Sequence, residues 1–164
     1  PLFYGGGQEG GQRPGTENLP GIAGFGKAAE LRAARFHSVL AELQRLRDRF
    51  EGRLLAEVDG VEVNGGPENR APNTTNLLFR EVEGQALMAR LDQEGIRCSQ
   101  SSACSSGRPE PSYVLRALGL SEDESYASVR FSFSELNTEQ EVDVAADTIA
   151  EIVEKLRAFA RLGA

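Results

Sequence analysis

The sequence SVRFSFSELNTEQEVDVAADTIAEIVEKL, residues 128–156, joins a strand pattern to a helix pattern and decides the fold class. Apolar and polar residues alternate from Ser128 to Ser134, which predicts a strand that buries one face. Thr138 and Glu141 follow with the spacing of a capping box, a pattern that begins helices. The apolar stripe of that helix consists of Val142, Ala145, Ile149, Ile152, Val153 and Leu156. This segment therefore predicts a strand followed by a long amphipathic helix.

Helix and strand patterns also alternate in the rest of the chain. The helix patterns cover a long segment after Thr16, then Glu83–Gln93 and Ser112–Leu118. The strand patterns cover Val61–Val63 and Asn73–Phe79. The predicted apolar stripe of the long helix consists of Phe36, Leu40, Leu43, Leu46 and Phe50. Such alternation indicates the α/β or the α+β class.

Composition and charge exclude several classes of protein. The chain has 164 residues, of which 40% are apolar and 26% are charged, as in an average globular domain. These values exclude collagen, disulfide scaffolds and disordered tails. The net charge of -7 argues against a nucleic-acid partner, which would require a basic surface. No apolar run approaches the roughly 18 residues of a membrane helix, so no membrane partner is expected.

The start of the sequence and its cysteines bear on processing and compartment. The chain opens at Pro1 and its only methionine is Met88, so we expect it to be part of a longer or cleaved protein. Pro1–Tyr4 lacks the basic and apolar regions of a signal peptide. Cys98 and Cys104 are so close in sequence that a disulfide between them would constrain little of the fold. We therefore expect free thiols and a cytoplasmic location.

Cys104 is the first candidate for chemistry, and it lies in the polar stretch CSQSSACSSGR, residues 98–108. We interpret residues 99–108 as a loop, because small polar residues do not bury well, and a thiol on such a loop is accessible. Arg108 would favour the thiolate. A free surface cysteine without a role is the alternative. Cys98 follows Ile96 at the end of a predicted strand and is expected to be a buried structural thiol.

The sequence offers Cys104 neither a local base nor a metal. His37 is the only histidine, and we interpret it as a solvated residue beside the apolar stripe of the long helix. Two cysteines and one histidine lack the number and the spacing of zinc ligands, so no metal site is expected. If Cys104 is a nucleophile, a cofactor or the substrate must activate it.

Arg130 is the second candidate. Strand alternation places it on the face opposite the predicted core residues Val129, Phe131 and Phe133. It shares that face with Ser128, Ser132 and Ser134. A guanidinium among hydroxyl groups is suited to bind a carboxylate through two parallel hydrogen bonds. A solvated arginine on a sheet face is the alternative.

The third candidate is the glycine-rich run GGGQEGGQRPGT, residues 5–16. Glycine lets backbone N–H groups approach an anion closely, and the helix start that follows attracts phosphate. The run has neither the P-loop nor the dinucleotide-binding pattern. A flexible connector is the alternative.

Seven motifs occur in a characteristic order along the chain. They are GGGQE at 5–9, RPGT at 13–16, APN at 71–73, EG at 83–84, SAC at 102–104, EPSYVLRALGL at 110–120 and VRFS at 129–132. Together they resemble the C-terminal part of a cysteine desulfurase, a pyridoxal phosphate (PLP) enzyme of the class V aminotransferase type. The resemblance extends from Leu2 to about Leu156.

The resemblance implies an α/β fold, that of a fold-type I PLP-dependent transferase. Residues 1–36 would be the end of the large PLP-binding domain, including a glycine-rich loop that contacts the other subunit of a homodimer. Residues 37–164 would be the small C-terminal domain with the catalytic cysteine loop.

The resemblance also implies the roles of three residues. Cys104 would take sulfur from L-cysteine, releasing L-alanine, and would carry it as a persulfide to an acceptor protein of an iron–sulfur cluster or thiolation pathway. Arg130 would bind the substrate carboxylate. Thr16 would reach the phosphate of the PLP bound to the partner subunit.

The family's Schiff-base lysine, in a Ser-x-His-Lys motif, has no match here. The only lysines, Lys27 and Lys155, lie in helix patterns. We therefore expect that an N-terminal half of the enzyme is missing and that this part alone is inactive. Two alternatives stay open. Selenocysteine lyase also fits RPGTEN at 13–18, and a non-catalytic persulfide carrier fits the absent lysine.

Overall fold

A three-stranded antiparallel sheet organises the described part of this computed structural model. The described residues are 3–66, 68, 70–100 and 110–162. In order across the sheet, the strands are β1 (Val61–Val63), β2 (Thr74–Phe79) and β3 (Ser128–Ser132). The chain divides into two units, Pro1–Ser38 and Val39–Ala164, and the sheet belongs to the second. Since its pairings are antiparallel, this unit taken alone has the α+β arrangement, one of the two that the alternation allowed.

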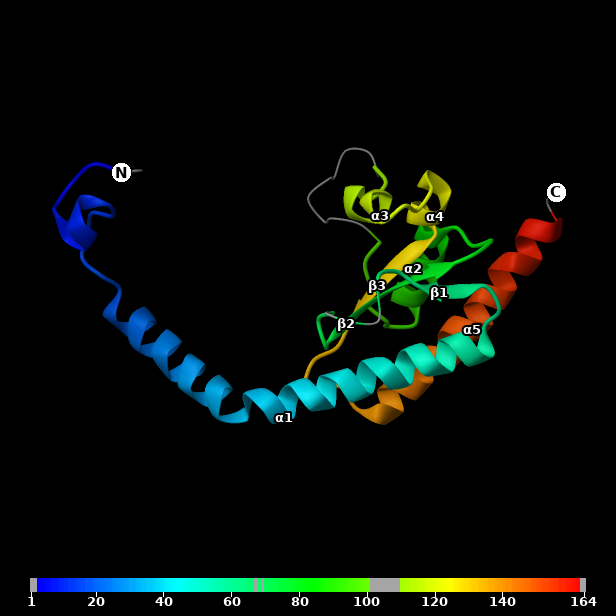
Figure 1. Ribbon diagram of the computed structural model, residues 1–164, viewed down its shortest axis with the longest axis horizontal. Coiled ribbons are helices and arrows are strands. Elements are labelled where there is room, and N and C mark those ends of the chain that lie inside the picture. Colours follow the sequence, from blue (N-terminus) through cyan, green and yellow to red (C-terminus); the bar gives the residue numbers. More distant parts are fainter. Residues whose placement is uncertain (1–2, 67, 69, 101–109, 163–164) are drawn as a thin grey trace. The chain divides into compact units, whose positions relative to one another are not determined.

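Three helices bury the apolar face of the sheet. They are α1 (Leu19–Glu57), α2 (Gly84–Gln93) and α5 (Glu139–Leu162). Figure 1 shows the second half of α1, in cyan, and α5, in orange to red, on the same side of the sheet. The ring of Phe50 on α1 lies 5.0 Å from the ring of Phe131 on β3, and both belong to one buried cluster. Leu87 and Leu91 of α2 and Ile149 of α5 complete this core.

Two short helices lie on the other side of the sheet in Figure 1, α3 (Tyr113–Ala117) and α4 (Glu122–Tyr126). Helix α4 begins with a capping box between Ser121 and Glu124. It covers Ser128, whose hydroxyl donates to the Glu124 carbonyl at 2.7 Å and is fully buried. The predicted outward direction of Ser128 therefore does not mean exposure, because α4 closes over that end of β3.

Several predicted helix starts are confirmed by their caps. Glu141 donates its backbone N–H to the Thr138 hydroxyl at 3.2 Å, and its carboxylate accepts the Thr138 N–H at 2.8 Å. This is the predicted capping box of α5. Ser112 caps α3, and the carboxylate of Glu83 caps α2 by accepting from Gln85 and Ala86.

Other sequence expectations are corrected. Strand β3 ends at Ser132 rather than Ser134, because β2 begins at Thr74 and Thr74 is the partner of Ser132. The predicted stripe of α1 is confirmed at Leu43, Leu46 and Phe50 but is wrong at Phe36, which is 45% exposed; Val39 and Leu54 are buried in addition. Helix α4 was not predicted, because the capping-box pattern of Ser121 and Glu124 was overlooked.

A ladder of ion pairs joins α1 to α5. Arg49 and Asp143 form a two-bond pair at 2.7 Å, and Arg53 meets Asp147 at 2.5 Å. Arg45 pairs with Glu139 one turn before them. These pairs flank the apolar seam and fix the side-by-side alignment of the two helices.

The first unit consists of a glycine-rich stretch and the beginning of α1. A 3-10 turn covers Gln8–Gly11, where Glu9, Gly10 and Gly11 have positive φ. Asn18 caps the start of α1, because its side chain accepts the Gly21 N–H at 3.1 Å. Among the described helices, none combines the length with the apolar character that crossing a bilayer requires.

Candidate functional site

Arg130 lies in the middle of β3, on the sheet face away from the core. Its neighbours Val129 and Phe131 are buried, whereas Arg130 is exposed, as predicted. On one side it pairs with Asn76 of β2. On the other side it forms an isolated antiparallel bridge with Ser99, in which Arg130 N donates to Ser99 O at 2.6 Å and Ser99 N to Arg130 O at 3.0 Å. The backbone of Arg130 is therefore held from both sides.

The guanidinium of Arg130 has a different environment from those of Arg49, Arg53 and Arg80. Arg49, Arg53 and Arg80 each form ion pairs with two or more carboxylates. Within the described residues, no hydrogen bond or ion pair occupies the side chain of Arg130. An exposed cation on a rigid strand, without a carboxylate from the described part of the chain, is available for an external one.

Gln100 anchors the chain next to this bridge. Its side chain is buried and donates a hydrogen bond to the Tyr126 carbonyl, at the end of α4. Gly84, the first residue of α2, lies against both groups. Residues 99 and 100 are thus held in place where α2, α4 and β3 meet, Ser99 by its bridge to β3 and Gln100 by its contacts with Tyr126 and Gly84. This junction was not predicted, because its three parts are far apart in the sequence.

Gly84→Ala should destabilise the chain. An added Cβ would overlap the Tyr126 carbonyl oxygen and lie 2.6 Å from Gln100 Nε2, and the Tyr126 oxygen belongs to the backbone. We expect a loss of about 1–3 kcal/mol in the free energy of unfolding, measured by urea denaturation. Gly52→Ala is the matched control, since its Cβ meets nothing within 4 Å on α1 and alanine favours helix. Equal stability of the two variants would contradict the crowded junction.

The described structure does not place two of the predicted site residues relative to Arg130. Cys104 lies outside the described residues, as does Arg108. Ser99 and Gln100, which precede Cys104 by five and four positions, are described. Thr16 is exposed in the first unit and makes no side-chain hydrogen bond to a described residue. The roles of Cys104, Arg130 and Thr16 remain predictions.

Cys98 is half-buried and packs against the core, in agreement with the structural role expected for it. Burial raises the pKa of its thiol to about 11, and the carboxylate of Asp92 contributes in the same direction. A neutral thiol is a poor nucleophile. Cys98 is therefore the wrong cysteine for nucleophilic chemistry.

The raised pKa predicts slow alkylation of Cys98. In Cys104→Ser, where Cys98 is the remaining cysteine, reaction with iodoacetamide at pH 8 should be on the order of 100-fold slower in the folded than in the unfolded chain. The rate should rise as the pH approaches 11, because the thiolate then forms. For the same reason stability should decline over that pH range, since the pKa of the folded state lies above that of the unfolded state. Equal rates in both states at pH 8 would contradict a protonated Cys98.

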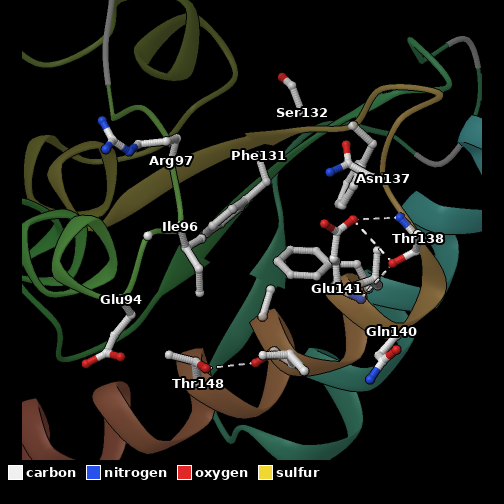
Figure 2. A pocket seen from close by; sticks show the side chains of 16 residues that line it. Glu94, Ile96, Arg97, Phe131, Ser132, Asn137, Thr138, Gln140, Glu141 and Thr148 are labelled. Carbon is white, nitrogen blue, oxygen red and sulfur yellow. Dashed lines mark hydrogen bonds between the residues drawn. The ribbon is translucent and has the colours of Figure 1, made fainter.

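A cavity of about 700 Å³ lies on the core side of the sheet. Figure 2 shows it between residues 94–97, the end of β3 and the start of α5, with Ile96 and Phe131 directed inward. Glu141 lies on its rim, but its carboxylate is engaged by Thr138, and the Thr138 N–H lowers the pKa of Glu141. Arg130 does not line this cavity. This cavity is therefore distinct from the exposed surface around Arg130 where a carboxylate could bind.

Both lysines are engaged in ion pairs, and the described residues contain no metal cluster. Lys27 pairs with Glu30 at 2.9 Å and Lys155 with Glu151 at 3.2 Å, both on exposed helix surfaces. No group of three or more potential metal ligands occurs in the described part of the chain.

Residues 7–144 match the model of the family described as aminotransferase class-V. The chain is 48% identical over 97% of its length to a protein of Trichormus azollae named "Cysteine desulfurase". It is 40% identical over 99% of its length to "Cysteine desulfurase IscS 1" of Archaeoglobus fulgidus. It spans 40% and 42% of the lengths of these two relatives.

Solved structures of similar fold agree with these sequence matches. A NifS-like protein from Rickettsia africae superposes with a TM-score of 0.79 at 30% identity, over 94% of this chain and 40% of that structure. A structure described as "SspA in complex with cysteine" has a TM-score of 0.57 at 30% identity, over 84% of this chain and 36% of that one.

Proposed function

Because this chain belongs to the class-V aminotransferase family, with a fold-type I architecture, we propose that it is the C-terminal part of a cysteine desulfurase. The complete enzyme would convert L-cysteine to L-alanine and retain the sulfur as a persulfide on Cys104. The names of the relatives support this activity. The similarity to SspA, a protein whose structure was solved in complex with cysteine, supports the substrate.

The arrangement around Arg130 is the observation that carries the proposal. Its guanidinium has no partner among the described residues and is available to the substrate carboxylate, and its backbone is paired with Ser99. Cys104 follows Ser99 by five residues. Five residues span at most about 17 Å. The proposed nucleophile Cys104 is therefore held within that distance of Ser99, which is paired with Arg130.

The proposed transfer balances without an external oxidant. The Cys104 thiolate forms a bond to the sulfur of L-cysteine, and the Cβ–S bond of the substrate breaks. The electron pair of that bond stays with the three-carbon fragment, which takes up the proton that Cys104 lost on forming its thiolate and leaves as L-alanine. Cys104 then carries the persulfide, whose outer sulfur passes to an acceptor protein. Cys98 cannot replace it, because its thiol stays protonated near neutral pH.

PLP is the cofactor of this family. When bound to the amino group of the substrate, it withdraws electrons and so makes the Cβ–S bond easier to break. Lys27 and Lys155 form ion pairs on exposed helices, and in this proposal the covalent lysine lies outside this chain. Thr16 is exposed and is not used as the cap of α1. It is therefore available to contact the phosphate of the PLP bound to the partner subunit of a homodimer. In this proposal residues 1–36 end the large domain and residues 37–164 form the small one.

Incubation with L-cysteine tests the proposal. The complete PLP-loaded enzyme should release one L-alanine per persulfide formed. Mass spectrometry should find the mass of one added sulfur on the peptide that contains Cys104. Absence of alanine, or sulfur on Cys98 alone, would contradict it. Comparing alanine release from L-cysteine and L-selenocysteine separates the desulfurase from a selenocysteine lyase, which the relatives reported above do not favour.

A further inference from the structure

Four polar residues form one row across the sheet. Asn64 pairs with Asn76 through its backbone N–H, which donates to Asn76 O at 2.8 Å. Asn76 is opposite Arg130, and Arg130 is opposite Ser99. Residues directly opposite one another in antiparallel strands project to the same face, with Cβ atoms about 4.5–5.5 Å apart. The side chain of Asn76 is therefore the cross-strand neighbour of the Arg130 guanidinium.

Hydrogen bonds fix the orientation of the Asn76 amide. The Ser128 hydroxyl donates its single proton to the Glu124 carbonyl at 2.7 Å, so it can only accept from Asn64. The group of Asn64 that lies 2.9 Å from it is thus the Nδ2 amide. The same Nδ2 lies 2.6 Å from Asn76, and the atom there must be the Oδ1 acceptor.

This leaves the Nδ2 amide of Asn76 as a directed donor. Asn64 and Ser128 are satisfied by each other and by Glu124, whereas Asn76 Nδ2 has no partner among the described residues. Asn76 is half-buried, so this donor is only partly hydrated. Beside it lies the guanidinium of Arg130, which no described residue pairs. Two adjacent donor groups, one of them cationic, form a binding site for an oxyanion.

We propose that Asn76 binds the same substrate α-carboxylate as Arg130, and that Asn64 positions the Asn76 amide for this contact. The inference rests on the proposed desulfurase function. Arg130 binds the two oxygens through its fork of N–H groups, and Asn76 donates a further hydrogen bond to one of them. The substrate class is thereby narrowed to α-amino acids with a free carboxylate.

Steady-state kinetics of the complete PLP-loaded enzyme test this role. Asn76→Ala should raise the KM for L-cysteine by about 10- to 100-fold, the effect of losing a hydrogen bond to a charged group. Its kcat should change little, because the contact is the same in the ground and transition states. Asn76→Asp should raise KM further, since it keeps the acceptor for Asn64 but places a negative charge beside Arg130. Asn64→Ala should raise KM less than Asn76→Ala. The Asn76 amide is then free to turn, but it can still donate to the carboxylate.

Binding of ligands that have no sulfur to release separates this contact from turnover. By calorimetry, Asn76→Ala should weaken L-alanine binding by a larger factor than binding of L-alaninamide, which has no carboxylate. Thr74→Ala is the matched control, on the same strand face and paired with Ser132, and should bind both ligands like the parent protein.

The outcomes are distinguishable. An unchanged L-alanine affinity in Asn76→Ala, with a weakened one in Arg130→Ala, would overturn the role of Asn76 and leave the proposed function intact. Loss of PLP on dialysis of Asn76→Ala, with unchanged L-alanine affinity, would assign the donor to the cofactor phosphate and also overturn it. If the parent enzyme releases no alanine from L-cysteine, the proposed function fails, and the calorimetry still decides whether Asn76 contacts a carboxylate.

Discussion

Cys104→Ser is expected to abolish sulfur transfer from L-cysteine, with a loss of kcat on the order of 10³-fold or more. A serine hydroxyl does not ionise near neutral pH, whereas a thiol does so readily and sulfur is the better nucleophile toward sulfur. Binding of PLP and of L-cysteine should persist, because the Arg130 bridge and the Gln100 anchor do not involve the thiol. The measurement is alanine release, together with the mass of the peptide that contains residue 104.

Cys98→Ser is the matched control for this variant. Cys98 is half-buried with a pKa raised to about 11, so it contributes packing and no nucleophile. Its replacement should reduce stability modestly and leave the kcat per folded enzyme unchanged. Full activity of Cys104→Ser, combined with inactivity of a folded Cys98→Ser, would reverse the assignment of the two thiols.

Arg130→Ala should mainly weaken capture of L-cysteine. Loss of a desolvated two-bond contact to a carboxylate costs about 2–4 kcal/mol, or roughly 30- to 1000-fold in kcat/KM. Because the side chain is exposed and makes no internal pair with described residues, the fold should tolerate the change. The measurement is the dependence of alanine release on L-cysteine concentration.

Two further variants sharpen the test of Arg130. Arg130→Lys keeps the charge but loses the planar fork, so it should recover only part of the affinity. Arg90→Ala removes an equal charge from the exposed surface of α2 and should leave KM unchanged. Equal effects of Arg90→Ala and Arg130→Ala would indicate a general influence of net charge rather than a contact.

Local signals predicted much of the fold. The strand at Val61–Val63 and the capping box of Thr138 and Glu141 are as expected, because alternation and capping depend on neighbouring residues. Helix α4 carried a local signal that was overlooked, the S-x-x-E pattern of Ser121 and Glu124. The extent of β3 depended on where β2 begins, and no short window of sequence contains that information.

The candidate site was predictable only in part. Alternation within one strand placed Arg130 on the outer face. Its partners Asn76 and Ser99 depend on the register of three separate segments. The tight approach of Gly84 to Tyr126 and Gln100 depends on packing between elements. Sequence reasoning could find Arg130 because its signal is local, and it missed Asn76, Asn64 and Gln100 because theirs are not.

The ladder between α1 and α5 restricts sliding of these helices. Its arginines and its acids are each spaced four residues apart, so every pair matches only when the two helices are in phase. A shift by one turn, about 5.4 Å, that placed Arg49 opposite Glu139 would leave only two of the three arginines opposite a carboxylate of α5. Arg49 lowers the pKa of Asp143, so the Arg49–Asp143 pair is lost only as the pH falls through that lowered value. Because only residues 133–138 connect β3 to α5, the ladder also limits how far Arg130 can move along the second half of α1.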